Sequence, residues 1–290
     1  MPPGTRGGEV TQYGTLSVLT AVAQKESLMH NTIRIVLALA LAAGVVAGLS
    51  SPLRAAEAVK AQAKPIQVVI LVGGHGYDQK NFDKAWGGHD DIQCEVWKGK
   101  PYSVFDDISK FKYDVIVMFN FSSGITDKQK ANFLTLLKKG VGLVVWHHAL
   151  ANCQNWPEFE KIAGCKFWLK EGKRDGKKIG GSGTGWGTIK MHIADPKHPI
   201  TKGMKDFEVY DEPYNKQTFV KGIQVLVTTE DPKSDKAVAW AHTYSGARVL
   251  GYQSGHDARA WKVAGFQRMM ANGIRWVARR LGVEVAKPRA

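Results

Sequence analysis

Four short runs of apolar residues constrain the fold of this chain more than any other feature. They are 66–72 (IQVVILV), 92–97 (IQCEVW), 114–119 (DVIVMF) and 141–146 (VGLVVW). Apolar runs that are rich in β-branched residues and lack polar–apolar alternation are typical of strands buried on both faces. Strands of this kind occur in parallel sheets covered by helices on each side. The four runs therefore predict the core of an α/β domain.

Helices are predicted between and after these runs. Thr126 stands at a helix N-cap position, Gln129 can complete a capping box with it, and Gly140 marks the helix end. A second helix is predicted over 157–163. Because parallel strands need crossover connections, this alternation predicts a doubly wound, mostly parallel sheet.

The second half of the chain is richer in strands. Strands are predicted at 188–193, 206–211, 223–229, 237–244 and 248–253, before an amphipathic helix over 264–280. The segment 171–187 holds seven Gly and six charged residues, and is either a solvated loop or a flap over a cleft. Since no linker or repeat divides the chain, a single domain is predicted over 65–281, with a C-terminal tail at 282–290.

The N-terminal part has the character of a targeting sequence. Residues 29–58 contain Arg34, an uncharged apolar stretch over 35–49 and an A-x-A cleavage pattern at 56–58. These are the parts of a secretory signal peptide, and an uncleaved membrane anchor is the alternative. Residues 1–28 precede a second Met and read as an extension or a misplaced start. Export to the periplasm or the cell exterior is expected.

The chain is basic, with 40 Lys and Arg against 26 Asp and Glu and a formal net charge of +14. The basic residues are scattered and do not interleave with aromatic residues in a stripe. A nucleic-acid partner is therefore not expected. A basic surface can still attract acidic glycans through its long-range field.

Four histidines follow predicted strands. His75 comes after the first strand, His147 and His148 directly after the fourth, and His256 after the last. Since ligands of open α/β sheets bind outside the carboxyl ends of the strands, we expect these histidines to share one cleft. The side chains of the adjacent His147 and His148 should diverge in an extended segment, so only one of the two is expected to face the cleft. His147, His148 and His256 are expected in acid–base catalysis. His75, His148 and His256 are the candidate ligands of a divalent metal such as zinc.

The best acidic candidates lie in FEVYDEPY, where Asp211 and Glu212 end a strand. Pro213 favours an extended Glu212, so these neighbouring carboxyls should point in opposite directions, unlike the facing pair of a glycosidase. Glu212 is expected to be catalytic, and Asp211 and Tyr214 are expected to contact substrate. Asp257 is a further candidate, which either fixes the tautomer of the preceding histidine or caps the next turn.

The chain carries no evident nucleophile. The turn after 141–146 is where an α/β hydrolase or an amidotransferase places Ser or Cys, and here it reads His-His-Ala-Leu. Cys153 comes seven residues after Trp146 and lacks a flanking Gly. Three Cys cannot build a disulfide framework, although Cys153 and Cys165 could pair after export.

Several motifs occur in a specific order over residues 66–280: GLVVWHHAL, a W-x-E-F segment, DPKHPITKG, DEPY, AVAWAHTYSGARV and SGHDARAW. In this order they resemble the trehalose-utilisation (ThuA-like) family of the class I glutamine-amidotransferase-like superfamily. The resemblance implies a flavodoxin-like fold without the amidotransferase cysteine, and a role in carbohydrate utilisation. It also implies that the following residues surround the cleft: His147, His148, Asp211, Glu212, Tyr214 and His256.

Two functions are compatible with these residues. The first is a carbohydrate-active hydrolase, lyase or isomerase that acts on a sugar, an oxidised sugar or a glycoside through histidine and carboxylate chemistry. Trp156 and Trp186 would then stack on sugar rings, although core packing is the simpler role of most Trp residues. The second is a non-catalytic sugar-binding or scaffold domain. A small carbohydrate is the expected partner in either case.

Overall fold

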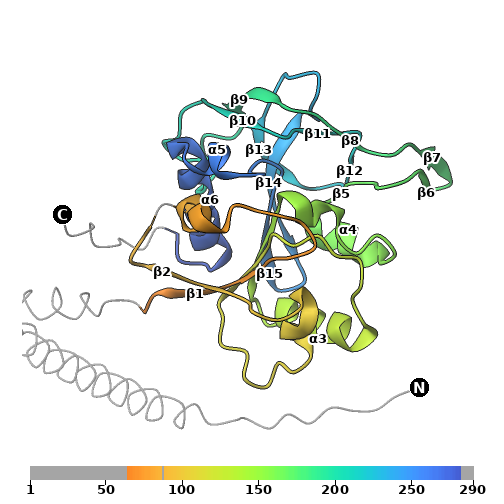
Figure 1. The fold of residues 1–290 in the computed structure, drawn as a ribbon, viewed down its shortest axis with the longest axis vertical. Coiled ribbons are helices and arrows are strands. Elements are labelled where there is room, and N and C mark those ends of the chain that lie inside the picture. Colours follow the sequence, from red (N-terminus) through yellow and green to blue (C-terminus); the bar gives the residue numbers. More distant parts are fainter. Residues whose placement is uncertain (1–63, 87, 282–290) are drawn as a thin grey trace, which may run out of the picture. The chain divides into compact units, whose positions relative to one another are not determined.

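A nine-stranded sheet forms the centre of the molecule in a computed structural model, which describes residues 64–86 and 88–281 (Figure 1). Its strands lie in the order β10-β9-β13-β14-β15-β4-β3-β1-β2. Five neighbouring strands are parallel: β2 (Ile92–Val96), β1 (Ile66–Leu71), β3 (Val115–Met118), β4 (Gly142–Trp146) and β15 (Ala247–Tyr252). This is the 2-1-3-4-5 order of flavodoxin-like sheets, so the predicted fold class is confirmed.

Four antiparallel strands extend the parallel half. They are β14 (Ala237–Tyr244), β13 (Gln224–Thr228), β9 (Gly187–Ile193) and β10 (Phe207–Asp211). The hydrophobic pattern predicted all nine strands to within one residue at each end. The pattern was sufficient because these strands are long, apolar and bounded by Gly, Pro or charged residues.

Helices cover both faces of the sheet. One face packs against α3 (Asp127–Lys138), α4 (Pro157–Ala163) and the short 3-10 helices η2 (Pro101–Phe105) and η3 (His147–Ala151). The other face packs against α5 (Ala258–Trp261), α6 (Ala264–Val277) and η1 (Gln79–Trp86). Strand β4 shows why its sequence is apolar throughout, because Val144 and Trp146 enter one core while Leu143 and Val145 enter the other.

The Gly-rich segment 171–187 is more ordered than a plain loop. It contains a hairpin of β6 (Gly172–Arg174) and β7 (Lys177–Ile179), which stands out at one side of the molecule in Figure 1. Asp175 and Gly176 have φ of 50° and 75°, the left-handed values that a tight hairpin turn needs. The segment then pairs as β8 (Gly183–Thr184) with β11 (Tyr214–Asn215). A similar short pair joins β5 (Cys165–Lys166) to β12 (Thr218–Phe219).

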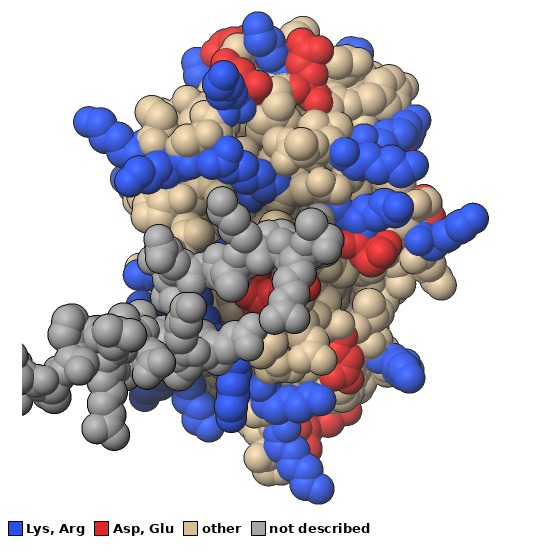
Figure 2. Space-filling view, turned by 90° about the vertical axis from the view of Figure 1, so that its left-hand side faces the viewer, with Lys and Arg blue, Asp and Glu red and all other residues tan. Residues whose placement is uncertain are grey.

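The predicted N-terminal extension (1–28), signal peptide (29–58) and C-terminal tail (282–290) lie outside the described residues. Within the described part, no helix is long and apolar enough to span a membrane. Cys153 and Cys165 are free, buried thiols, so the pairing considered above is not made. Figure 2 shows Lys and Arg spread over one face of the surface, with Asp and Glu between several of them.

Candidate functional site

The site begins at the carboxyl end of β4, where strand turns into 3-10 helix. His147 is the first residue of η3, is fully buried and has φ of 47°. Left-handed backbone is uncommon outside Gly. The turn is therefore as sharp as the elbow that presents a nucleophile in α/β hydrolases, and it presents an imidazole instead.

Hydrogen bonds fix the tautomer of His147. Its Nδ1 lies 2.5 Å from the carbonyl oxygen of Gln253, which can only accept, so Nδ1 carries a proton. Its Nε2 lies 3.0 Å from the hydroxyl of Tyr214. Burial raises the pKa of Tyr214 well above its ordinary value, and the charges of Glu212 and Asp211 act in the same direction. The hydroxyl therefore stays protonated at neutral pH.

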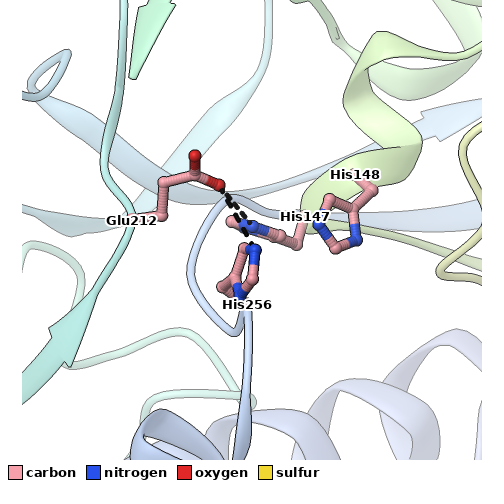
Figure 3. A group of neighbouring side chains, drawn as sticks. All are labelled: His147, His148, Glu212 and His256. Atoms are coloured by element: carbon pink, nitrogen blue, oxygen red, sulfur yellow. Dashed lines mark ion pairs between the residues drawn. The ribbon is translucent and has the colours of Figure 1, made fainter. Parts of the chain in front are cut away.

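Glu212 brings a carboxylate to the same point. Its Oε2 lies 3.3 Å from Nε2 of His147 and 3.9 Å from Nε2 of His256 (Figure 3). Together with His148, these residues offer four potential ligand atoms that all lie within 4.8 Å of one another. The elements involved are η3, the segment after β10 and the loop after β15, which are far apart in the sequence.

Burial and neighbouring groups together shift the pKa values of Glu212, His148 and His256. Burial alone would raise the pKa of Glu212, but its hydrogen bond to His147 and the charges of His147 and His256 lower it below its ordinary value. Burial lowers the pKa of His148 strongly, and the neighbouring imidazoles add to this effect. Burial and His147 also lower the pKa of His256, although Glu212 opposes them. At neutral pH, the ionised carboxylate of Glu212 therefore lies close to the neutral imidazoles of His148 and His256.

Several ring nitrogens in the site have no hydrogen-bond partner within the described residues. They are both nitrogens of His148 and Nδ1 of His256. Burying unpaired polar atoms is costly, so such atoms are expected to have a use. Three imidazoles and one carboxylate are also donors that zinc prefers. The site therefore fits a divalent metal both in its donor set and in its unpaired nitrogens.

His75 lies at the outer side of this group. It is exposed, and its ring stacks on His148 with centroids 3.9 Å apart. Its ring centroid is 5.4 Å from that of His256. The strand topology thus gathers all four predicted histidines. However, the clustered donor set differs from the expected metal ligands, because His147 and Glu212 belong to it and His75 does not.

Asp211 has a different position from the one expected for a substrate contact. It is only 1% exposed, and its carboxylate accepts hydrogen bonds from the Ser254 hydroxyl, from Gly255 N (2.5 Å) and from His256 N (3.0 Å). Its partners are thus three consecutive residues of the loop that carries His256. Asp211 therefore bonds to this loop, whereas Glu212 lies beside the imidazoles of His147 and His256.

Trp186 and Trp156, both predicted to stack on sugar rings, lie in different parts of the molecule. Trp186 is 40% exposed and its ring meets that of His256 edge to face, with centroids 4.8 Å apart. Trp156 instead packs at the start of α4, against Phe133 and Phe159, and does not line the pocket. Asp257 caps α5 through Arg259 N, and its Oδ2 is 3.7 Å from Nδ1 of His256, which is beyond hydrogen-bond distance.

An open pocket of about 140 Å³ lies beside the cluster. Its lining comprises His75, Phe121, His148, Ala151, Phe167, Leu169, Thr184, Glu212 and Tyr214. The apolar residues of this lining were not predicted from the sequence. Phe121 could have been found, because it follows β3 just as the histidines follow their strands. Thr184 and Leu169 could not, because they lie at or beside a Gly-rich segment without a local signal.

Comparison with known proteins gives a consistent result. The family model described as ThuA, trehalose utilisation, matches residues 68–277. A ThuA-like protein from Parabacteroides merdae shares the fold with a TM-score of 0.63 and 21% identity, over 77% of this chain and 94% of that one. A second, from Bacteroides uniformis, has a TM-score of 0.57 and 20% identity, over 74% and 92%. At these identities the likeness concerns the fold. No curated protein matches the sequence.

Proposed function

Because the chain belongs to the trehalose-utilisation (ThuA) family, we propose that it acts on a sugar or glycoside by acid–base chemistry at the pocket. The observation that carries the proposal is the convergence of His147, His148, Glu212 and His256, whose ligand atoms lie within 4.8 Å of one another. Glu212 is the proposed proton acceptor, because its carboxylate is ionised at neutral pH and has a second oxygen besides the one in the cluster.

A divalent metal such as zinc is proposed as the cofactor. His147, His148, Glu212 and His256 would hold it, and the Nδ1 bond from His147 to the Gln253 carbonyl is the kind of outer contact that orients metal-binding imidazoles. When bound, the metal would act as a Lewis acid toward a sugar oxygen or water. The protein would position the sugar in the pocket and keep the carboxyl group of Glu212 in its ionised form.

The proposed chemistry differs from that of ordinary two-carboxylate glycosidases. Those enzymes need two carboxyl groups that face each other across the bond. Here Glu212 is the one carboxylate in the lining of the described pocket. Asp211 is buried, and its carboxylate is hydrogen-bonded to the loop after β15. Proton abstraction beside a sugar carbonyl, or cleavage assisted by a Lewis acid, therefore suits the site better. The enzyme would be a lyase, an isomerase or a metal-assisted hydrolase.

The test combines elemental analysis with sugar turnover. The protein should be purified without a metal-affinity tag, and His147→Ala, Glu212→Gln and His256→Ala should be compared with His192→Ala. His192 lies on β9 and pairs with Asp206, outside the cluster. About one metal ion per chain is expected in the wild type and in the control, with a strong loss in the other three. Turnover of trehalose or of its oxidised derivatives should fall in parallel.

A non-catalytic sugar-binding domain is the competing function. It would bind sugars without converting them, and its affinity would survive both chelation and the His147→Ala and His256→Ala substitutions. Calorimetric titration of wild type and variants with glucose and trehalose, before and after chelation, separates the two functions. Unchanged affinity without turnover would replace the enzymatic proposal by the binding one.

A further inference from the structure

Two large aromatic side chains remain exposed beside the catalytic cluster. Trp186 is 40% exposed and Tyr210 is 43% exposed, and with Leu169 they are the large hydrophobic residues of this kind in the described chain. Their rings stack with centroids 6.1 Å apart and planes 22° from parallel. They come from neighbouring strands at one side of the sheet, since Trp186 directly precedes β9 and Tyr210 belongs to the edge strand β10. Exposed apolar side chains that lie together are more informative about binding than apolar side chains scattered singly over a surface.

The position of these rings is held by ionic and hydrogen-bond contacts. The guanidinium of Arg259 lies 4.7 Å from the centroid of each ring. Arg259 is itself fixed by Asp257, through bonds from Nε of 3.0 and 3.1 Å and from Nη2 of 2.5 Å. Lys233 Nζ adds a 3.1 Å bond to the carbonyl oxygen of Trp186. The surface is thus preorganised, which lowers the entropy lost when a ligand binds.

This surface is continuous with the pocket. Trp186 touches His256, and His256 Nε2 lies 3.9 Å from the Glu212 carboxylate, which lines the pocket. Thr184, two residues before Trp186, also lines the pocket. A ligand that reaches beyond the cluster on this side would therefore meet the two aromatic rings next.

We infer that Trp186, Tyr210 and Arg259 form a second subsite, which binds an uncharged sugar ring adjoining the ring held in the pocket. The flat aromatic rings suit the C–H face of a sugar, because the electron-rich ring face attracts C–H groups. The guanidinium of Arg259 is already paired with the Asp257 carboxylate, so it is not free to bind the carboxylate of a uronic acid or a sugar phosphate. The inference rests on the proposed function and specifies its substrate as a glycoside with at least two rings.

The test measures binding of one-ring and two-ring sugars to the whole protein. Dissociation constants of glucose, of a neutral disaccharide (trehalose) and of glucuronic acid are compared for wild type, Trp186→Ala, Tyr210→Ala and Trp186→Phe. Wild type should prefer the disaccharide to glucose. In Trp186→Ala and Tyr210→Ala this preference should fall about tenfold, as expected for the loss of one aromatic contact. Trp186→Phe should keep most of it, because a flat apolar ring remains.

The outcomes separate this inference from the proposed function. A preference that is the same in Trp186→Ala as in wild type, or a wild type that prefers glucuronic acid, would overturn the subsite while leaving the pocket intact. Absence of binding of every sugar, together with absence of metal, would overturn the proposed function and the subsite with it. Thermal unfolding of each variant confirms that it is folded.

Discussion

Asp211 and Glu212 are neighbours in sequence but act at different places. Asp211 is buried and accepts three hydrogen bonds from residues 254–256, whereas Glu212 faces the pocket. In the same loop, the Gln253 carbonyl oxygen accepts a hydrogen bond from Nδ1 of His147. The buried carboxylate of Asp211 therefore holds a loop that orients His147 and carries His256. This makes Asp211 a positioning residue.

Replacement of Asp211 by Asn should weaken the site. An amide offers one acceptor oxygen in place of two and turns an NH₂ group toward the donors of the loop, so His256 would lose its fixed position. We expect zinc affinity to fall about 10- to 100-fold, as for other outer-contact substitutions, and the pH profile of turnover to change. Competition with a chelating dye measures the affinity.

Asp206→Asn is the matched control for this prediction. Asp206 also accepts a backbone hydrogen bond, from Ile193 N, but it is exposed and pairs with His192 away from the pocket. Its replacement should leave zinc affinity unchanged. If both variants bind zinc like the wild type, the positioning role of Asp211 is refuted.

Helix α3 shows how local sequence defines an element. The Thr126 hydroxyl accepts a bond from Gln129 N, and the Gln129 side chain accepts one from Thr126 N, so the predicted capping box is present. Phe133, Leu136 and Leu137 bury the inner face of the helix. The two capping residues lie within one turn of each other and the apolar residues lie within the same helix, so no tertiary information was needed to predict it.

Thr126→Ala should destabilise the protein without affecting the site. Loss of the cap should lower the free energy of unfolding by about 1 kcal/mol. Thr135→Ala on the same helix is the control, because Thr135 bonds only to the preceding turn at Ala131 O and Ala has the higher helix propensity. Urea unfolding of both variants measures the difference. An equal loss in both would contradict the role of the cap.

At the scale of the whole molecule, buried histidines link stability to pH. His198 and His242 lie outside the pocket, and burial lowers the pKa of both. The unfolded chain, with a histidine pKa of about 6.5, therefore binds more protons than the folded one when the pH falls. Stability should be highest above about pH 6.5 and should decrease below it, by at most about 1.4 kcal/mol per pH unit for each such histidine.

The His198→Gln variant tests this dependence in metal-free protein. In the wild type, Nδ1 of His198 accepts a bond from Ile200 N at 3.2 Å, and protonation would remove it. The variant should lose less stability than the wild type between pH 7 and pH 5, as measured by urea unfolding at each pH. An identical pH dependence in the two proteins would show that His198 does not contribute.

The sequence by itself determined the strands, the capped helix and the expectation that histidines gather at one sheet edge. These features follow from local hydrophobicity, turn chemistry and the rule that parallel strands end together, so no long-range information was needed. Tertiary structure alone decided which neighbour of the Asp211–Glu212 pair faces the pocket, that Trp186 and not Trp156 lies beside it, and that Glu212 joins the cluster of candidate metal ligands. These choices depend on the order of the strands in the sheet and on the backbone N–H groups of the loop 254–256, which need a hydrogen-bond acceptor. Neither can be read from the spacing of residues along the chain.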